Sequence, residues 1–201
     1  MTSKGSDIMI IRKLFKFENA HIVRGCSTQR CRASIHGHSY KVEVLFESQY
    51  LDGGQMVYDF GLMKLGMKEL IDSFDHAVAI WDGDDPAYIE AIKEHSERWV
   101  CLPVSPSCEQ FARVFFLMID RLLRSTLMIN GERGVKLHSI IVHETDTGYA
   151  QAFEEDAYSE WMGTIDLDEI EFSYAVRREW NDPELWEKIL SGALFTNPDT
   201  V

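Results

Sequence analysis

The stretch that decides the fold is residues 36–46, which reads HGHSYKVEVLF and alternates in character from one residue to the next. Successive side chains of a β-strand point to opposite faces of the sheet. One face of this stretch holds imidazole, aromatic and aliphatic groups, from His36, His38, Tyr40, Val42, Val44 and Phe46. The other face holds polar groups, from Ser39, Lys41 and Glu43. The pattern predicts a strand with two imidazoles together on one face at its start.

A second alternating stretch, residues 8–21, precedes this strand and places Phe17 and His21 on the same side. If the two strands pair as a hairpin, the imidazoles of His21, His36 and His38 converge on one point. Three histidines with an open fourth position are a ligand set of catalytic zinc. The two stretches together therefore predict a Zn²⁺ site.

The loop between the strands, residues 22–35, offers a competing ligand set. Cys26 and Cys31 precede His36 and His38 with the spacing C-x4-C-x4-H-x-H. Those four residues would form a closed structural zinc site and would leave the histidine of the first strand without a role. The ligand spacing alone therefore leaves a catalytic and a structural zinc site open.

The same loop is basic in a chain that is otherwise acidic. It contains Arg24, Arg30 and Arg32 and no aspartate or glutamate. Nearby guanidinium groups lower the pKa of a thiol and favour the thiolate, so Cys31 or Cys26 becomes a candidate base or nucleophile. Guanidinium groups also bind phosphate, which predicts a phosphorylated substrate near this loop.

The composition excludes other classes of function. The 201 residues include 33 acids and 20 bases, for a formal net charge of −13, and this surface repels nucleic acid. No segment approaches the ~18 uninterrupted apolar residues of a membrane helix. Residues Met1 to Asp7 are polar and lack the apolar run of a signal peptide. We therefore expect a cytoplasmic protein with reduced cysteines and without a membrane partner.

The rest of the chain predicts three helices and one more strand. Helical periodicity and capping signals predict helices at residues 59–74, 84–98 and 107–122. Alternation predicts a strand at residues 135–144. This order predicts an α+β fold, with helices covering one face of a mainly antiparallel sheet.

The chain is predicted to have a main domain and an extension. Residues 8–150 carry the strands and long helices, whereas residues 151–201 show helical signals, including Gly192 as the stop of a short helix. Aromatic residues in the extension, Trp161, Phe172, Trp180 and Trp186, predict that it docks on the main domain or on another subunit.

Six short segments and a cysteine occur in an order that resembles a known family. They are residues 15–21, Cys31, and residues 36–42, 56–60, 74–76, 106–112 and 142–145. The chain resembles the 6-pyruvoyltetrahydropterin synthases and their bacterial relatives, the 6-carboxytetrahydropterin synthases of queuosine biosynthesis. The resemblance covers roughly residues 8–150 and implies a tunnelling fold, in which subunits join their sheets into an oligomeric barrel.

The resemblance also implies a role for individual residues. The zinc ligands are His21, His36 and His38. The proton-abstracting thiol is Cys31, with Cys26 as the remaining candidate, and it works with Asp75 and His76 of a neighbouring subunit. Glu144 anchors the pterin, since a carboxylate accepts two parallel hydrogen bonds from an amino group and a ring N–H. Glu109 has a secondary place near the pterin.

The activity that the resemblance implies is that of a zinc-dependent carbon–carbon lyase. It would convert 7,8-dihydroneopterin triphosphate to 6-carboxy-5,6,7,8-tetrahydropterin with loss of acetaldehyde and triphosphate. The alternatives are formation of 6-pyruvoyltetrahydropterin from the same substrate, and a non-catalytic zinc protein. A homo-oligomer with shared active sites is expected, with no nucleic-acid partner.

Overall fold

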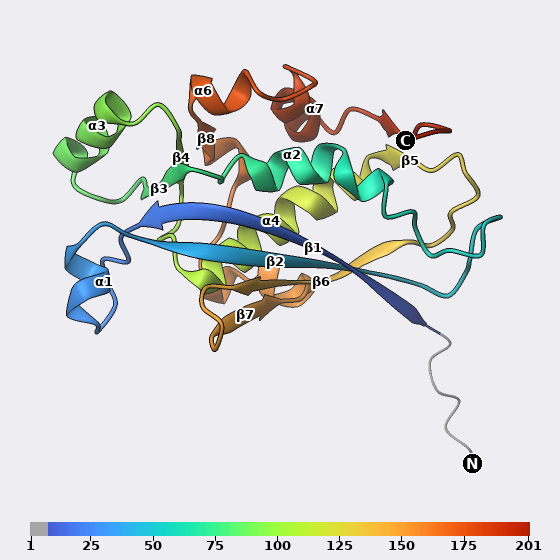
Figure 1. Ribbon diagram of the computed structural model, residues 1–201, viewed down its shortest axis with the longest axis horizontal. Coiled ribbons are helices and arrows are strands. Elements are labelled where there is room, and N and C mark those ends of the chain that lie inside the picture. The colour runs from blue at the N-terminus through green and yellow to red at the C-terminus, as the bar shows by residue number, and fades with distance from the viewer. Residues whose placement is uncertain (1–7) are drawn as a thin grey trace, which may run out of the picture.

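The two alternating stretches form the central hairpin of the sheet in the computed structural model, which describes residues 8–201 (Figure 1). Strand β1 (Met9–His21) pairs with strand β2 (His36–Ser48) along its whole length, from Met9 opposite Ser48 to His21 opposite His36. Residues 1–7, on which the expectation about a signal peptide rests, lie outside the described residues.

The sheet is extended on both sides of this hairpin. Strand β6 (Lys136–His143) pairs antiparallel with β2, and β7 (Tyr149–Ala152) pairs antiparallel with β6. On the other side, β3 (Ala77–Trp81) runs parallel to the end of β1, β4 (Trp99–Leu102) runs parallel to β3, and β8 (Glu171–Phe172) is antiparallel to β4. The order among the described residues is β7-β6-β2-β1-β3-β4-β8. The α+β prediction is confirmed, and the sheet is mixed because of the two parallel pairs.

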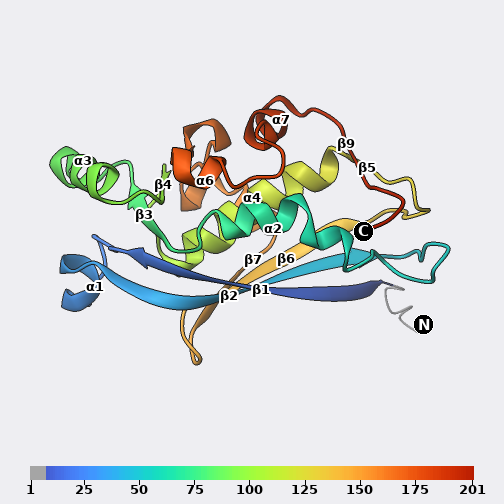
Figure 2. The ribbon, with the colours of Figure 1, turned by 45° about the horizontal axis from the view of Figure 1, so that its top comes forward.

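Helices cover one face of this sheet. Figure 2 shows α2 (Gly66–Asp72) and α4 (Cys108–Arg124) on the same side of the strands. Aromatic rings fill the space between these layers: Phe17 stacks on Tyr40 with ring centroids 4.8 Å apart, and Phe74 meets Phe115 at the same separation. The other α-helices are α1 (Gln29–Ala33), α3 (Pro86–His95), α5 (Glu154–Ala157), α6 (Tyr174–Arg177) and α7 (Leu185–Ser191). No helix among residues 8–201 is both long and apolar enough to cross a membrane.

The predicted helix at residues 59–74 is shorter and interrupted. It consists of the 3-10 helix η1 (Leu62–Lys64) and helix α2, and Leu65 between them has a non-helical backbone with φ −84° and ψ −132°. Asp59 accepts a hydrogen bond from the Gly61 N–H at 2.6 Å, so it caps the turn before η1. The capping signal of α4 is confirmed, because the Ser107 hydroxyl accepts from the Gln110 N–H at 3.3 Å.

Residues 151–201 pack on the main body, and they are not purely helical. They contribute β8 to the main sheet and β9 (Phe195–Thr196) to a small sheet with β5 (Thr126–Leu127). They also contain the 3-10 helices η2 (Glu160–Met162) and η3 (Leu167–Glu169). Helices α6 and α7 lie beyond α2 and α4, on the side away from the sheet (Figure 2). The domain boundary at residue 150, which falls within β7, stays a prediction.

Phe172 packs in the core against both Trp180 and Trp186, with ring centroids 5.4 and 5.0 Å apart respectively. Trp161 is fully exposed in the single chain, so it does not take part in this docking.

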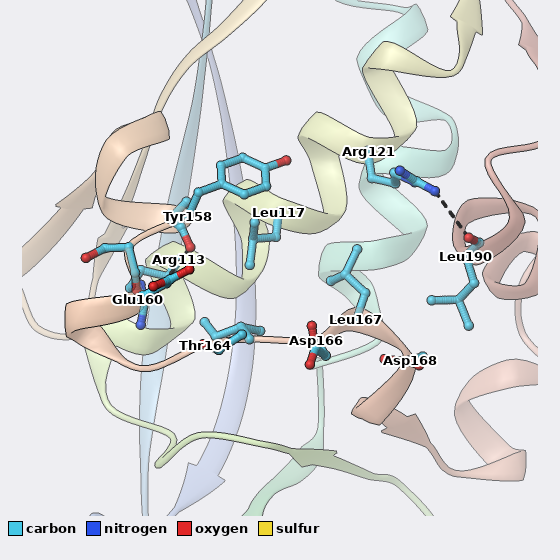
Figure 3. Close-up of a pocket in the computed structure, with 13 residues that line it drawn as sticks. Arg113, Leu117, Arg121, Tyr158, Glu160, Thr164, Asp166, Leu167, Asp168 and Leu190 are labelled. Carbon is cyan, nitrogen blue, oxygen red and sulfur yellow. Dashed lines mark hydrogen bonds between the residues drawn. The ribbon is translucent and has the colours of Figure 1, made fainter.

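One buried arginine fastens the start of the extension to α4. Arg113 is only 3% exposed, and its guanidinium donates hydrogen bonds to five main-chain carbonyls of the extension, at Asp156, Ala157, Ser159, Met162 and Gly163. A cavity of about 460 Å³ lies beside it, between α4 and the extension (Figure 3). On the far side of this cavity, Arg121 donates to the Leu190 carbonyl at 3.3 Å.

Replacing Arg113 by methionine should destabilise the fold. The change keeps most of the buried volume but removes a donor from five carbonyls. The Met162 carbonyl keeps the Gln110 amide and the Asp156 carbonyl keeps the Ser159 N–H, so the other three lose their donor, and each unsatisfied buried group is costly. We expect the free energy of unfolding in urea to fall by about 2–4 kcal/mol. The matched control is Arg178→Met, which removes an exposed arginine 3.8 Å from Glu97 and should cost less than about 0.5 kcal/mol. Equal losses in the two variants would contradict this account.

Candidate metal centre and active site

Three histidines gather where the central hairpin begins its loop. The register places His21 directly opposite His36, and His38 follows two residues along β2 on the same face. One ring nitrogen from each of the three lies within 4.8 Å of the others. His21 is completely buried, whereas His36 and His38 are half-buried, so the cluster is open on one side. The predicted convergence of the three imidazoles is therefore present.

Backbone carbonyls fix which nitrogen of each ring faces the cluster. The His21 Nδ1–H donates to the Pro106 carbonyl at 2.6 Å, and the His36 Nδ1–H donates to the Ser34 carbonyl at 3.0 Å. In the neutral rings both Nε2 atoms then carry a bare lone pair, and these atoms are 3.2 Å apart. Two nitrogens bound to one tetrahedral zinc at ~2.0–2.1 Å are separated by ~3.3 Å. The donor set therefore fits a metal ion, and the carbonyls orient its ligands.

The surroundings of His21 and His38 favour the neutral rings that a metal requires. Burial lowers the pKa of His21, and the nearby His36 ring lowers it further, although the Pro106 carbonyl opposes this shift. Burial also lowers the pKa of His38, against the opposing effect of Glu144. A neutral imidazole keeps the lone pair that binds a metal, so the cluster is prepared for binding near neutral pH.

Glu144 lies beside the same cluster, just after the end of β6. Its Oε1 atom is 3.9 Å from the His21 Nε2 and 4.0 Å from the His38 Nε2. The Tyr40 hydroxyl donates to this oxygen at 3.3 Å. Burial, and next the charge of Glu144, raise the pKa of Tyr40 far above its usual range, so the hydroxyl stays protonated. A half-buried carboxylate is thus held close to the histidines.

The two cysteines of the loop do not belong to the histidine cluster. Cys31 lies half-buried in α1, and its carbonyl accepts from the Val23 N–H at 3.1 Å. The Cys26 thiol donates to the Thr28 carbonyl at 3.3 Å. The metal-binding group found among residues 8–201 contains the three histidines alone. This arrangement favours the three-histidine site over the closed site with two cysteines.

One of the three loop arginines is already paired. The Arg24 Nε donates to both carboxylate oxygens of Asp84, at 2.8 and 3.0 Å, and its guanidinium lies over the Tyr88 ring. Asp84 precedes α3, and Figure 1 places α1 and α3 at the same end of the molecule. The expectation that Arg24 serves a thiolate or a phosphate therefore needs correction: it ties the loop to α3. Its partner, Asp84, lies 60 residues away in the sequence.

Asp75 and His76 form an ion-pair-like contact at the turn between α2 and β3. The His76 Nδ1 lies 2.9 Å from the Asp75 Oδ2, and the other carboxylate oxygen accepts from the Glu18 N–H at 2.7 Å. His76 is exposed and borders an open hollow of about 340 Å³ that His38 also lines. Within one chain, the pair is therefore near the edge of the histidine site and is open to further contacts.

Glu109 is exposed in the first turn of α4. The same end of α4 follows Pro106, whose carbonyl orients His21, so Glu109 is at the border of the site. Sequence reasoning missed the Pro106 carbonyl and the Tyr40 hydroxyl. A buried tyrosine usually needs a hydrogen-bond partner, and this rule was the available signal for Tyr40.

Comparison with known proteins places this arrangement in a family. The family model described as 6-pyruvoyl tetrahydropterin synthase matches residues 10–155. The chain belongs to this family. Within the synthase family, it is 38% identical over 184 residues to a 6-carboxy-5,6,7,8-tetrahydropterin synthase from Helicobacter pylori, covering 91% of this chain and 92% of the relative. It is 32% identical to the protein of that name from Aquifex aeolicus, and the match covers 72% of this chain and 98% of the relative.

Solved structures of other proteins share the fold of this chain. An uncharacterized protein from Wolinella succinogenes matches with a TM-score of 0.58 at 22% identity, over 74% of this chain and 99% of that one. A 6-pyruvoyl tetrahydropterin synthase from Plasmodium falciparum matches with a TM-score of 0.51 at 19% identity, over 72% of this chain and 96% of that one. Both matches confirm the predicted fold, and membership in this family of synthases confirms the prediction of an enzyme.

The four thiols should differ sharply in reactivity. Burial raises the pKa of Cys101 to about 11 and that of Cys108 to about 12, whereas Cys26 and Cys31 are half-buried. An alkylating reagent near neutral pH should therefore modify Cys26 and Cys31 and leave the other two as thiols. Peptide mass spectrometry measures this pattern, and the unfolded chain, in which all four should react, is the control. Modification of Cys108 in the folded protein would be inconsistent with this placement.

Proposed function

We propose that this chain is a zinc-dependent 6-carboxy-5,6,7,8-tetrahydropterin synthase that acts on 7,8-dihydroneopterin triphosphate and releases acetaldehyde and triphosphate. The observation that supports this most strongly is the cluster of His21, His36 and His38, with its bare nitrogens turned inward beside a carboxylate. The names of the Helicobacter and Aquifex relatives support the carboxy product. The role in queuosine biosynthesis follows from the resemblance described above and is part of the proposal.

In this proposal the three histidines hold the zinc. His21 and His36 would each bind it through the Nε2 atom. Bound zinc would polarise the oxygens of the substrate side chain and stabilise negative charge as a carbon-bound proton leaves. The carbonyls of Pro106 and Ser34 keep the first two rings in the tautomer that this requires.

The remaining residues bind the substrate and move its protons. Cys31 is assigned as the base that accepts the carbon-bound proton, the role that the resemblance implies, with the His76 imidazole of a neighbouring subunit beside it. Asp75 and His76 assist it, and His76 passes protons at its free Nε2 while Asp75 holds the Nδ1. Glu144 accepts hydrogen bonds from the pterin, and Glu109 contacts the bound ligand from the start of α4.

We further propose a homo-oligomer in which neighbouring subunits complete the active site. Three observations support this: the exposure of His76, the openness of the histidine site, and the outer part of β1 with its exposed apolar side chains. That part includes Met9, Ile10 and Leu14, which are 55%, 47% and 40% exposed. An exposed apolar strand is suited to pairing with another chain. Residues 8–150 are the catalytic domain and residues 151–201 the extension in this proposal.

The second candidate is 6-pyruvoyltetrahydropterin synthase, which would retain the side-chain carbons of the same substrate. The description of the matching family model favours it. Both activities use the same first proton abstraction, so the residue assignments above apply equally to each.

Metal content and turnover should separate the ligands from the base. We expect the wild type to hold about one zinc per chain, and His36→Ala to lose most of it because a ligand is missing. Cys31→Ala should retain the zinc but lose at least about 100-fold in turnover, as expected for loss of a general base. The matched control is Cys26→Ala, which should keep both the zinc content and the turnover of the wild type. Loss of zinc from Cys31→Ala would make that cysteine a ligand and refute this assignment.

The product should distinguish the two candidate activities. Incubation of the zinc-loaded protein with 7,8-dihydroneopterin triphosphate should yield 6-carboxytetrahydropterin and acetaldehyde, both identified by mass spectrometry. Accumulation of 6-pyruvoyltetrahydropterin without the carboxy product would support the second candidate. Protein without metal serves as the control for spontaneous breakdown of the substrate.

A further inference from the structure

We propose that Arg98 and the C-terminal extension position the Asp75–His76 pair, with Glu179 as the contact that joins them. Arg98 is then a positioning residue, and the extension supports the active site from behind. This inference rests on the proposed function, because it assumes that Asp75 and His76 take part in the reaction.

The turn that carries the pair has a demanding backbone. His76 has φ +52°, in the left-handed region that residues other than glycine rarely adopt. One main-chain hydrogen bond and one bond to a side-chain carboxylate hold this conformation against β1. The His76 N–H donates to the Glu18 carbonyl at 2.7 Å, and the Glu18 N–H donates to the Asp75 carboxylate at 2.7 Å. The direction of the imidazole therefore depends on how firmly the turn is kept beside β1.

A buried asparagine of β1 fixes the residues on either side of the pair. The Asn19 side chain is 4% exposed, and its Nδ2 donates to the Phe74 carbonyl and to the Ala77 carbonyl, both at 2.9 Å. These carbonyls lie immediately before and after the pair. The front of the turn is thus fastened to the strand that also carries His21.

Arg98 holds the same turn from the other side. Its Nε donates to the Asp75 carbonyl at 2.9 Å, and one terminal nitrogen donates to the Asp72 carbonyl at 3.0 Å. The second terminal nitrogen donates to the Glu179 carboxylate at 2.6 Å. One planar guanidinium thus joins two carbonyls of the turn region to the extension. Lysine has a single nitrogen and cannot reproduce this fork.

The extension reinforces this contact with the two residues that follow. The Trp180 indole N–H donates to the buried Ser73 hydroxyl at 2.9 Å. Asn181 donates from its backbone and its side chain to the Glu69 carboxylate, at 2.9 and 2.8 Å. Three consecutive residues of the extension therefore hold the end of α2 and the turn that follows it. None of them contacts the three histidines in these hydrogen bonds, so their effect on the site passes through the turn.

The direct test compares Arg98→Lys and Glu179→Gln with a matched control. Glu187→Gln removes the same charge from another glutamate of the extension, whose partner, Arg177, is also in the extension. We expect Arg98→Lys to lower kcat about 10- to 100-fold with KM changed less than about twofold, since a small misplacement of a reacting group has effects of that size. Glu179→Gln should lower kcat about threefold. Zinc content should stay at the wild-type value in all three variants, and the kcat of Glu187→Gln should equal that of the wild type.

A second measurement shows whether Arg98 acts through His76. In a His76→Ala background, Arg98→Lys should cause no further loss of kcat, because the group that it positions is gone. A loss as large as that in the wild-type background would overturn the proposal. An unchanged kcat in Arg98→Lys alone would overturn it as well.

Amide hydrogen exchange tests the same contact without any substrate. The N–H groups of His76 and Glu18 should exchange faster in Arg98→Lys and Glu179→Gln than in wild type, while those of β2 and β6 should not change. Unchanged exchange at His76 would contradict the positioning role even if the proposed activity is confirmed. If the variants exchange faster at His76 but the wild type shows no turnover, the contact exists and the proposed function is wrong.

Discussion

The structure depends on the register between β1 and β2. Because side chains alternate along a strand, a shift of one residue would turn every inward side chain of one strand outward. The stacked rings of Phe17 and Tyr40 and the aromatic residues of α4 leave no room for such a shift. The same register brings His21 opposite His36, with His38 two residues further along. The packing of the core and the geometry of the histidine cluster are therefore consequences of one pairing.

The site combines this rigid pairing with polar groups supplied by distant segments. Carbonyls before α4 and in the loop orient two histidines, and Tyr40 connects the cluster to Glu144. Burial lowers the pKa of His21 and of His38, which disfavours their protonated forms, and the carbonyls fix which nitrogen of His21 and His36 is bare. A bound metal ion would satisfy nitrogens that otherwise face one another. The extension, through Arg98, reaches the opposite border of the site at the Asp75–His76 turn.

Prediction from the sequence succeeded where the pattern was local and failed where it was not. The hairpin, the strand at residues 135–144 and the helix after Ser107 follow from periodicity and capping, and they are present. Strands β3 and β4 were missed, since a short apolar run that is buried on both faces shows no alternation. The predicted helix at residues 59–74 is longer than the observed one, because the apolar spacing continues through Leu65, where the backbone is not helical.

The sequence by itself determined the α+β class, the family, and the three histidines as a convergent group. These depend on residues that lie close along the chain or on opposed positions of one hairpin. Only the tertiary structure decided that Arg24 is paired with Asp84, that Arg113 fastens the extension, and that Arg98 joins the extension to the Asp75 turn. The partners in these contacts are 23 to 81 residues apart. No local period encodes such pairs, because their geometry exists only after the sheet and helices have packed.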